Sequence, residues 1–360
     1  MSRVFVSDCE GPISKNDNAF ELASHYIPRG DRFFTVVSRY DDVLADVLKR
    51  KGYKAGDTLK LILPFLKAHG ATNSEMESFS ARTLVLIPHA HEAMKHIQGL
   101  AQAFIVSTSY EHYIKALCRA IGFPYVNTYC TQVDIDRYEL SLEEQRRLRR
   151  LALEIADMPI IEIPAGASSL EDFPENQRRA LMRLDEIFWE EIAQMKVGRI
   201  LREVNPVGGY EKAQAVRDIA QKLGVKLADI MYVGDSITDV EAFRLVRDGG
   251  GLTVSFNGNK YALRNAEVAV ISETSLVTAV IAELFIHLGK SETIRILENW
   301  SWETLEKAPA SCKMLEKLSA AYQGELPKVK LVTGENMDAL ARESEEFRKK
   351  VRGETVGGLG

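Results

Sequence analysis

The chain has 360 residues, of which 46% are hydrophobic and 27% are charged, as is typical of a globular protein. Its net charge of −5 and isoelectric point near 5.9 provide no overall attraction to nucleic acid or to an anionic membrane. The most apolar stretch, residues 275–288, contains Glu283 and is shorter than the roughly 18 residues of a membrane span. We therefore expect a protein that binds neither nucleic acid nor a membrane.

Short apolar runs bounded by turn residues recur along the chain, and stretches with a helical spacing of apolar residues separate them. These runs predict strands at 4–7, 103–106, 230–233, 252–256 and 268–271. Strands that alternate with helices predict an α/β, Rossmann-like fold with a parallel sheet covered on both faces. In such sheets, binding sites form beyond the carboxyl ends of the strands.

Two long segments interrupt this alternation. The first lies between the first two strands, contains far more residues than a crossover needs, and predicts a helical cap with helices at 20–26, 41–51, 59–69 and 74–80. The second is also predicted to be mostly helical, with one helix starting at Ser141, another at 175–194, and a candidate short strand at 160–164.

The pattern changes after residue 290, where an amphipathic stretch at 292–322 and a helix at 337–351 precede a glycine-rich end that we expect to be flexible. The predicted organisation has four parts: a core of residues 1–13, 89–140 and 206–290, a helical cap at 14–88, a second helical insertion at 141–205, and a helical C-terminal extension at 291–360 with a flexible tail.

The cysteines and the N-terminus indicate the compartment. None of the four cysteines forms a Cys-x-x-Cys pair, and a chain of this length does not need disulfides. The first eight residues lack the apolar run of a secretory signal and include Asp8. We expect a reducing, cytoplasmic location.

Two of the predicted strands end in acidic residues close to a glycine. Asp8 follows the first strand, and Asp235 follows the strand at 230–233, with Asp239 one helical turn further on. Buried carboxylates need a partner or a cation. We therefore expect Asp8 and Asp235 to hold one divalent cation between them, with Asp239 facing the same site.

Ser107 and Lys212 add a hydroxyl and a positive charge. Ser107 follows the strand at 103–106 just before a predicted helix start, an arrangement that binds anions. Lys212 lies at the start of another predicted helix, after Gly208-Gly209. Phosphate ester hydrolysis needs such a set, because negative charge must be neutralised and the phosphoryl group held in line. Mg²⁺ prefers carboxylates, carbonyls and water as ligands, and the peptide carbonyl of Glu10 can face it.

These motifs, in this order, resemble those of the haloacid dehalogenase-like hydrolases, and within them the capped phosphatases similar to phosphoserine phosphatase. The resemblance covers the segments 4–11, 104–109, 209–212, 232–243 and 252–271. Residues 126–141 also resemble a hairpin that precedes the lysine segment in the phosphoserine phosphatase group. More narrowly, the chain resembles an archaeal branch of the superfamily that is sometimes labelled subunit R of an energy-converting hydrogenase.

The family resemblance implies a role for each site residue. Asp8 would be the nucleophile and a metal ligand, and Ser107 the phosphoryl-binding hydroxyl. Lys212 would stabilise charge, Asp235 would be the main acidic ligand of Mg²⁺, and Asp239 would support it. The expected function is a Mg²⁺-dependent phosphatase that acts on a small phosphorylated metabolite through an aspartyl phosphate.

Glu10 departs from the family pattern. The family's phosphatases usually carry Asp two residues after the nucleophile, where it protonates the leaving oxygen. Glu can do the same acid–base work, but its carboxyl group lies one methylene further out, so either the site is adjusted to Glu10 or turnover is slow. Two alternatives follow: an assembly or regulatory subunit that binds a protein partner and has little catalysis, and a phosphomutase.

Overall fold

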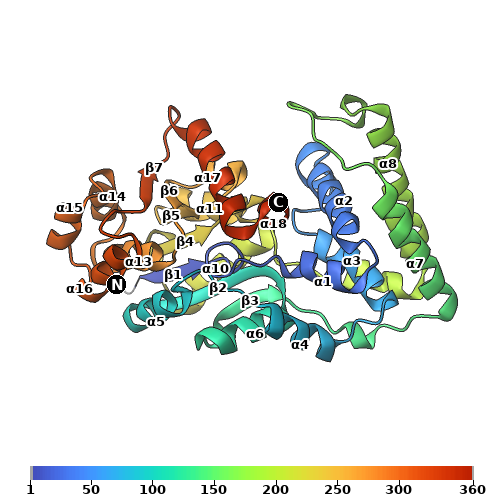
Figure 1. The fold of residues 1–360 in the computed structure, drawn as a ribbon, viewed down its shortest axis with the longest axis horizontal. Helices are drawn as coiled ribbons and strands as arrows, with labels where there is room; N and C mark the ends of the chain where they lie inside the picture. The colour runs from blue at the N-terminus through green and yellow to red at the C-terminus, as the bar shows by residue number, and fades with distance from the viewer. Residues whose placement is uncertain (1–2, 359–360) are drawn as a thin grey trace.

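A computed structural model describes residues 3–358. It contains a seven-stranded sheet in the order β3-β2-β1-β4-β5-β6-β7 (Figure 1). The strands are β1 (Val4–Ser7), β2 (Gln102–Tyr110), β3 (Thr128–Thr131), β4 (Ile230–Gly234), β5 (Leu252–Phe256), β6 (Val268–Ile271) and β7 (Lys328–Leu331). Each neighbouring pair is parallel apart from β6 and β7, which are antiparallel. The predicted α/β fold with a parallel sheet is confirmed.

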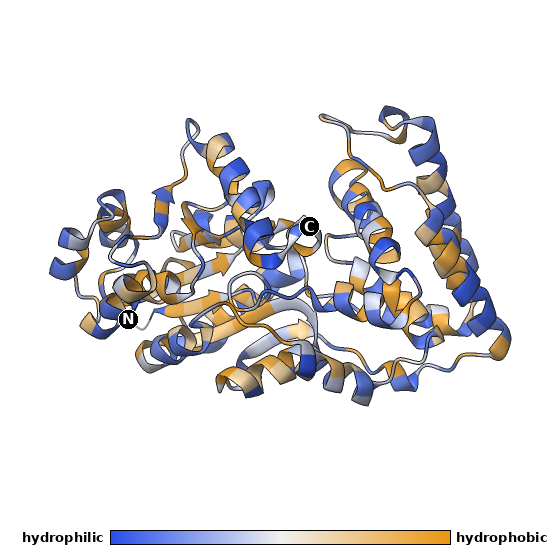
Figure 2. Cartoon of the chain, in the orientation of Figure 1, coloured by the Kyte–Doolittle hydropathy of each residue, from blue (hydrophilic) through white to orange (hydrophobic). Residues whose placement is uncertain are grey.

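Apolar side chains cover both faces of the sheet. Val4 and Val6 belong to one buried cluster and Phe5 to another, because successive residues of a strand point to opposite faces. The central strands of the sheet are accordingly among the most hydrophobic parts of the chain (Figure 2). The covering helices are α5 (Ala90–Leu100), α6 (Glu111–Ile121), α10 (Tyr210–Leu223), α11 (Val240–Asp248), α12 (Lys260–Leu263) and α13 (Leu276–Leu288).

The structure differs from the predicted elements in several places. β3 and β7 were not predicted. The candidate strand at 160–164 is wrong: this segment has no regular structure, and its bounding prolines, Pro159 and Pro164, lack the amide hydrogen of a ladder. The expected hairpin at 126–141 is also wrong, because β3 pairs with β2 and a short 3₁₀ turn follows it.

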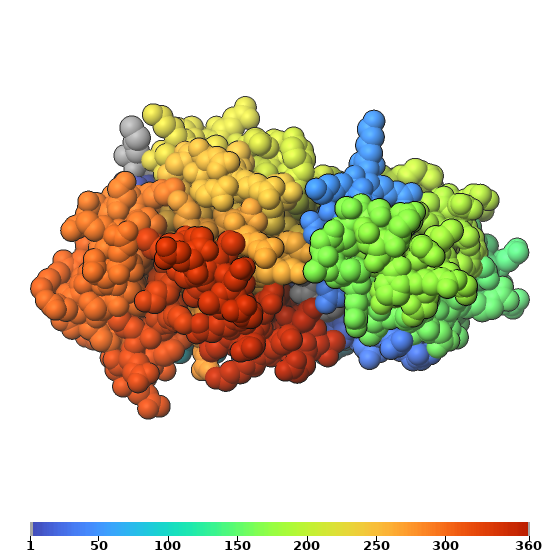
Figure 3. All heavy atoms as spheres, turned by 90° about the horizontal axis from the view of Figure 1, so that it is seen from above, coloured from blue at the N-terminus to red at the C-terminus, as the bar shows by residue number. Residues whose placement is uncertain are grey.

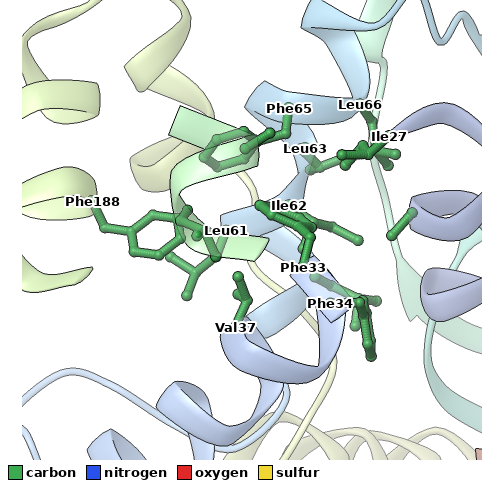
Figure 4. Close-up of a cluster of buried hydrophobic side chains, with 14 of the residues drawn as sticks. Ile27, Phe33, Phe34, Val37, Leu61, Ile62, Leu63, Phe65, Leu66 and Phe188 are labelled. Carbon is green, nitrogen blue, oxygen red and sulfur yellow. The ribbon is translucent and has the colours of Figure 1, made fainter. Parts of the chain in front are cut away.

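Helices between β1 and β2 pack against helices between β3 and β4. The first group is α1 (Asn18–Tyr26), α2 (Gly30–Asp42), a π-helical turn (Val43–Val47), α3 (Thr58–Ala68) and α4 (Asn73–Thr83). The second is α7 (Leu142–Asp157), α8 (Glu175–Glu186), a π-helical segment (Ile187–Ile192) and α9 (Ile200–Glu203). Both contribute to one buried apolar cluster, which includes Phe33, Phe65 and Phe188 (Figure 4).

Two details of these helices bear on the predictions. The helix expected at 41–51 is misplaced, because α2 begins at Gly30 and the π-helical turn ends at Val47. Ser141 caps α7 in a reciprocal box with Glu144, as its sequence pattern predicts.

The C-terminal part contains α14 (Lys290–Glu298), α15 (Trp302–Lys307), α16 (Cys312–Ala321), α17 (Met337–Arg352) and α18 (Glu354–Gly357). Figure 3 shows its last residues, in red, beside the helices that follow β1, in blue. Within the expected flexible tail, α18 is helical and the carbonyl of Gly358 accepts a hydrogen bond from Arg39 (2.9 Å). The four-part division of the chain stays a prediction. None of the helices in residues 3–358 is long and apolar enough to cross a membrane.

Candidate active site

The topology of the sheet explains why distant acidic residues meet. β1 pairs in parallel with β2 and with β4, and Ser7 lies opposite both Ile105 and Val233. The residues that follow these three positions therefore leave the sheet at the same edge. The amide of Asp8 donates a hydrogen bond to the carbonyl of Val233 (2.8 Å), which places the Asp8 side chain beside the end of β4.

Ser107 lies in an irregular part of β2. The strand continues to Tyr110, further than predicted. Val106 pairs with Tyr129 and Tyr110 with Thr131, so β2 contains two more residues than β3 between these pairs and bulges. The hydroxyl of Ser107 is buried, donates to Ser109 Oγ and accepts from the Ser109 amide, both at 3.2 Å. The bulge thus places Ser107 at the same edge of the sheet as Asp8, although its side chain is buried.

Lys212, in the first turn of α10, connects Asp8 to Asp239. Its ammonium group lies 2.6 Å from Asp8 Oδ2 and 2.8 Å from Asp239 Oδ1, and its side chain is fully buried. Burial alone lowers the pKa of Lys212, but the charges of Asp239 and Asp8 raise it above its ordinary value. Burial raises the pKa of Asp8 to about 7, although Lys212 opposes the shift. Lys212 therefore stays charged and compensates two buried carboxylates.

Asp239 accepts five hydrogen bonds from residues that the structure describes. Oδ1 receives the ammonium of Lys212 and the hydroxyl of Tyr232 (2.7 Å). Oδ2 receives the amides of Asp235 and Ser236, both at 3.0 Å, and the hydroxyl of Ser236 (3.4 Å). A carboxylate held in this way orients Lys212 and fixes the loop after β4. This geometry agrees with the supporting role that the family resemblance implies for Asp239.

Glu10, two residues after Asp8, contacts the cap. Its Oε1 accepts a hydrogen bond from the amide of Asn18 (2.7 Å) at the start of α1. Burial, followed by the charge of Asp17, raises the pKa of Glu10 well above its ordinary value. The longer side chain therefore reaches the first cap helix, and the raised pKa favours the protonated form that a general acid needs.

A cavity of about 110 Å³ lies between the sheet edge and the cap. Asp8, Glu10, Ser107 and Asp235 line it from the sheet, and Thr108 contributes a buried hydroxyl that has no partner within residues 3–358. Cap residues close the opposite side: Phe34, Ser38, Asp41, Asp42, Thr58 and Leu59. The cavity can hold a phosphoryl group and a small leaving group.

The sequence did not indicate two further residues, Arg348 and Arg352 of α17. Both line the cavity, and both contact Oδ2 of Asp235, Arg352 at 3.2 Å. They lie one turn apart in a helix rich in charged residues, a pattern that ordinarily marks a solvated face. They share one face of the helix with Leu340 and Ser344, which are also buried, but this spacing alone does not show what that face packs against.

The acidic residues fit a divalent cation. Asp8, Asp235 and Asp239 are buried, and each places one carboxylate oxygen within 4.8 Å of the others. Hard oxygen donors of this kind suit Mg²⁺. Because five donors already occupy Asp239, Asp8 and Asp235 would be the direct ligands. Asp8 and Asp235 thus lie together as the sequence predicted.

Comparisons with known proteins identify the family. Residues 93–283, slightly more than half of the chain, match the haloacid dehalogenase-like hydrolases, and the chain belongs to this family. A solved structure of a gene product from Archaeoglobus fulgidus is similar over its whole length, with 29% identity and a TM-score of 0.78 over 100% of this chain and 99% of that one.

A more distant similarity is to phosphoserine phosphatase in its apo form, with 11% identity and a TM-score of 0.41 over 76% of this chain and 96% of that one. This similarity is too low to assign an activity. No curated protein matches the chain. The family predicted from the motifs is confirmed, whereas the label of a hydrogenase subunit stays a prediction.

Proposed function

We propose that this hydrolase-family protein is a Mg²⁺-dependent phosphatase that acts on a small phosphorylated metabolite through phosphorylation of Asp8. The observation that carries the proposal is the contact of Asp8 with Lys212, next to Asp235, in the cavity between the sheet and the cap. An aspartate at the end of a strand that had no role beyond the local turn would not need a fully buried lysine beside it. A nucleophile for a negatively charged phosphoryl group needs such a positive charge beside it.

Each residue has a part in this reaction. Asp8 Oδ attacks phosphorus, the bond from phosphorus to the leaving oxygen breaks, and protonated Glu10 supplies a proton to that oxygen. Ser107 and Thr108 offer hydroxyls to the phosphoryl oxygens, and Lys212 compensates their charge. Asp8, Asp235 and the carbonyl of Glu10 would hold Mg²⁺, which when bound neutralises charge on the phosphoryl oxygens. Water then hydrolyses the aspartyl phosphate, with Glu10 as the base.

The direct test is a panel of phosphate monoesters assayed with Mg²⁺ and with EDTA. Wild-type protein should release phosphate from at least one ester only with Mg²⁺. Asp8→Asn should lower kcat by a factor of about 10³ or more, because the amide is not a nucleophile. Asp248→Asn is the matched control, because Asp248 is exposed at the end of α11. Equal turnover by Asp8→Asn and wild-type protein would rule the mechanism out.

Two outcomes would favour the alternatives. Isomerisation of a phosphorylated substrate without phosphate release would indicate a mutase. No turnover across the panel, together with stable association with a protein partner, would indicate an assembly or regulatory subunit.

A further inference from the structure

Helix α17 is firmly attached to the sheet domain. Its residues Leu340 and Ala341 pack with Leu263 and Ala269. Ser344 Oγ donates to the carbonyl of Gly258 (2.7 Å). These contacts place the next turns of the helix, which carry Arg348 and Arg352, at the cavity that Asp8 and Asp235 also line.

Each guanidinium nitrogen of Arg352 donates a hydrogen bond to another part of the protein. Its Nε donates to the carbonyl of Lys15 (3.0 Å), one Nη to the carbonyl of Asn16, and the other Nη to Oδ2 of Asp235 (3.2 Å). Lys15 and Asn16 belong to the segment where the chain leaves β1 for the cap. Arg352 therefore fixes this crossing and the Asp235 side chain, and it is a positioning residue.

Arg348 differs from Arg352, because part of its guanidinium group is left without an acceptor. Its Nη1 contacts Oδ2 of Asp235, but its Nε is buried and has no partner within residues 3–358. The side chain is 4% exposed, and burial lowers the pKa of Arg348. A buried guanidinium with an unused N–H is costly unless an acceptor arrives. Because Arg348 lines the cavity, a ligand bound there can supply this acceptor.

The charges of the site indicate what that acceptor is. In the structure the carboxylates of Asp8, Asp235 and Asp239 are balanced by Lys212, Arg348 and Arg352. Without the arginines, a divalent cation alone would restore neutrality. With them, these six residues and one divalent cation together carry a net charge of about +2, which a phosphate monoester near neutral pH would neutralise.

We infer that Arg348 of α17 is an anion-binding residue that contacts the phosphoryl group of the substrate, while Arg352 positions Asp235, which Arg348 also contacts. The inference rests on the proposed function and assigns part of the site to the C-terminal extension. A planar guanidinium suits phosphate oxygens better than a lysine ammonium does, since it can donate two parallel hydrogen bonds.

The test is binding of inorganic phosphate to the full chain in the presence of Mg²⁺, measured by titration calorimetry. Arg348→Ala should raise the Kd for phosphate by about 10- to 100-fold, and Arg348→Lys by less. The Kd for Mg²⁺ alone should change less than the Kd for phosphate. Lys350→Ala is the control on the same helix, because Lys350 is exposed and pairs with Glu273. Circular dichroism and Tm verify that each variant is folded.

Two results would overturn the inference. One is phosphate binding that is absent in the wild-type protein or unchanged in Arg348→Ala. The other is tighter Mg²⁺ binding and faster turnover in Arg348→Ala, which would show that Arg348 competes with the metal for Asp235. Phosphate binding that depends on Arg348, without hydrolysis of any ester, would instead leave the inference standing and remove the phosphatase.

Discussion

Gly11 allows the loop after β1 to pass directly beside Asp235. Its φ is +102°, and a Cβ at this position would lie 2.1 Å from Asp235 Oδ2. Any other residue would therefore strain the backbone and displace the carboxylate that Arg348 and Arg352 contact. Close approach of the two acidic loops depends on the absence of a side chain here.

Gly11→Ala should separate the effect of this contact from that of backbone strain. We expect a loss of about 1–2 kcal/mol in unfolding free energy from the left-handed conformation, a further loss from the overlap, and at least tenfold weaker Mg²⁺ binding. Gly70→Ala is the control: φ is +93°, and a Cβ there would meet no described atom within 4 Å. Denaturant unfolding and Mg²⁺ titration measure the two effects. Equal Mg²⁺ affinity in both variants would contradict the role of Gly11.

Asp41 makes the stability of the cap dependent on pH. Its oxygens accept from the Tyr53 hydroxyl (2.6 Å) and the Gly56 amide (3.0 Å), and burial raises the pKa of Asp41 from 3.8 to about 7. The folded protein therefore keeps a proton that the unfolded chain releases. This contribution to stability is complete below about pH 4 and is lost as the pH rises through 7, at up to about 1.4 kcal/mol per pH unit.

Asp41→Asn should remove this contribution, since an amide does not titrate. The difference in unfolding free energy between wild-type protein and Asp41→Asn should fall between pH 4 and 7 and stay constant above about pH 8. Asp31→Asn, at an exposed position of the same helix, should differ from wild-type protein by the same amount at every pH. Chemical denaturation across this range is the measurement, and parallel curves for wild-type protein and Asp41→Asn would refute it.

At the scale of elements, the sheet strands could be predicted because their signals are local. The runs that form β1, β5 and β6 are apolar and bounded by turn residues, and their ends coincide with the predicted ones. β7 was missed because it lies at the sheet edge, where only one of its residues is buried. An edge strand in which lysines alternate with apolar residues has no apolar run to mark it.

The same distinction applies to the site. Asp8, Asp235 and Lys212 could be predicted because strand ends of a parallel sheet converge by topology. Arg348 could not, because its position depends on where α17 packs, and that depends on contacts with residues about 80 positions away in the chain, a dependence no local propensity records. Helix packing, rather than sequence periodicity, turns a charged helix face toward the cavity.

At the scale of the whole molecule, the segments after β1 and after β3 pack around one apolar cluster. Their helices share the cluster in Figure 4, although 53 residues, 89–141, separate the predicted cap from α7 in the chain. Phe188 of the second segment stacks near Tyr40 and meets the edge of Phe65, with ring centroids 5.8 and 6.1 Å apart. Because a close-packed cluster loses contacts cooperatively, the two segments should also open together.

Phe188→Ala tests this coupling. We expect a loss of about 3–5 kcal/mol in unfolding free energy, because a fully buried ring is replaced by a cavity. In hydrogen exchange, α2 and α3 should lose protection together with α7 and α8, while β1 and β4 keep theirs. Phe256→Ala is the matched control, because Phe256 is equally buried but belongs to the apolar cluster that contains Phe5 of β1. This variant should lower protection in the strands first. A loss of protection confined to α8 in Phe188→Ala would show that the two segments are independent. The cavity wall formed by Asp41 and Phe34 would then not depend on the second insertion for its rigidity.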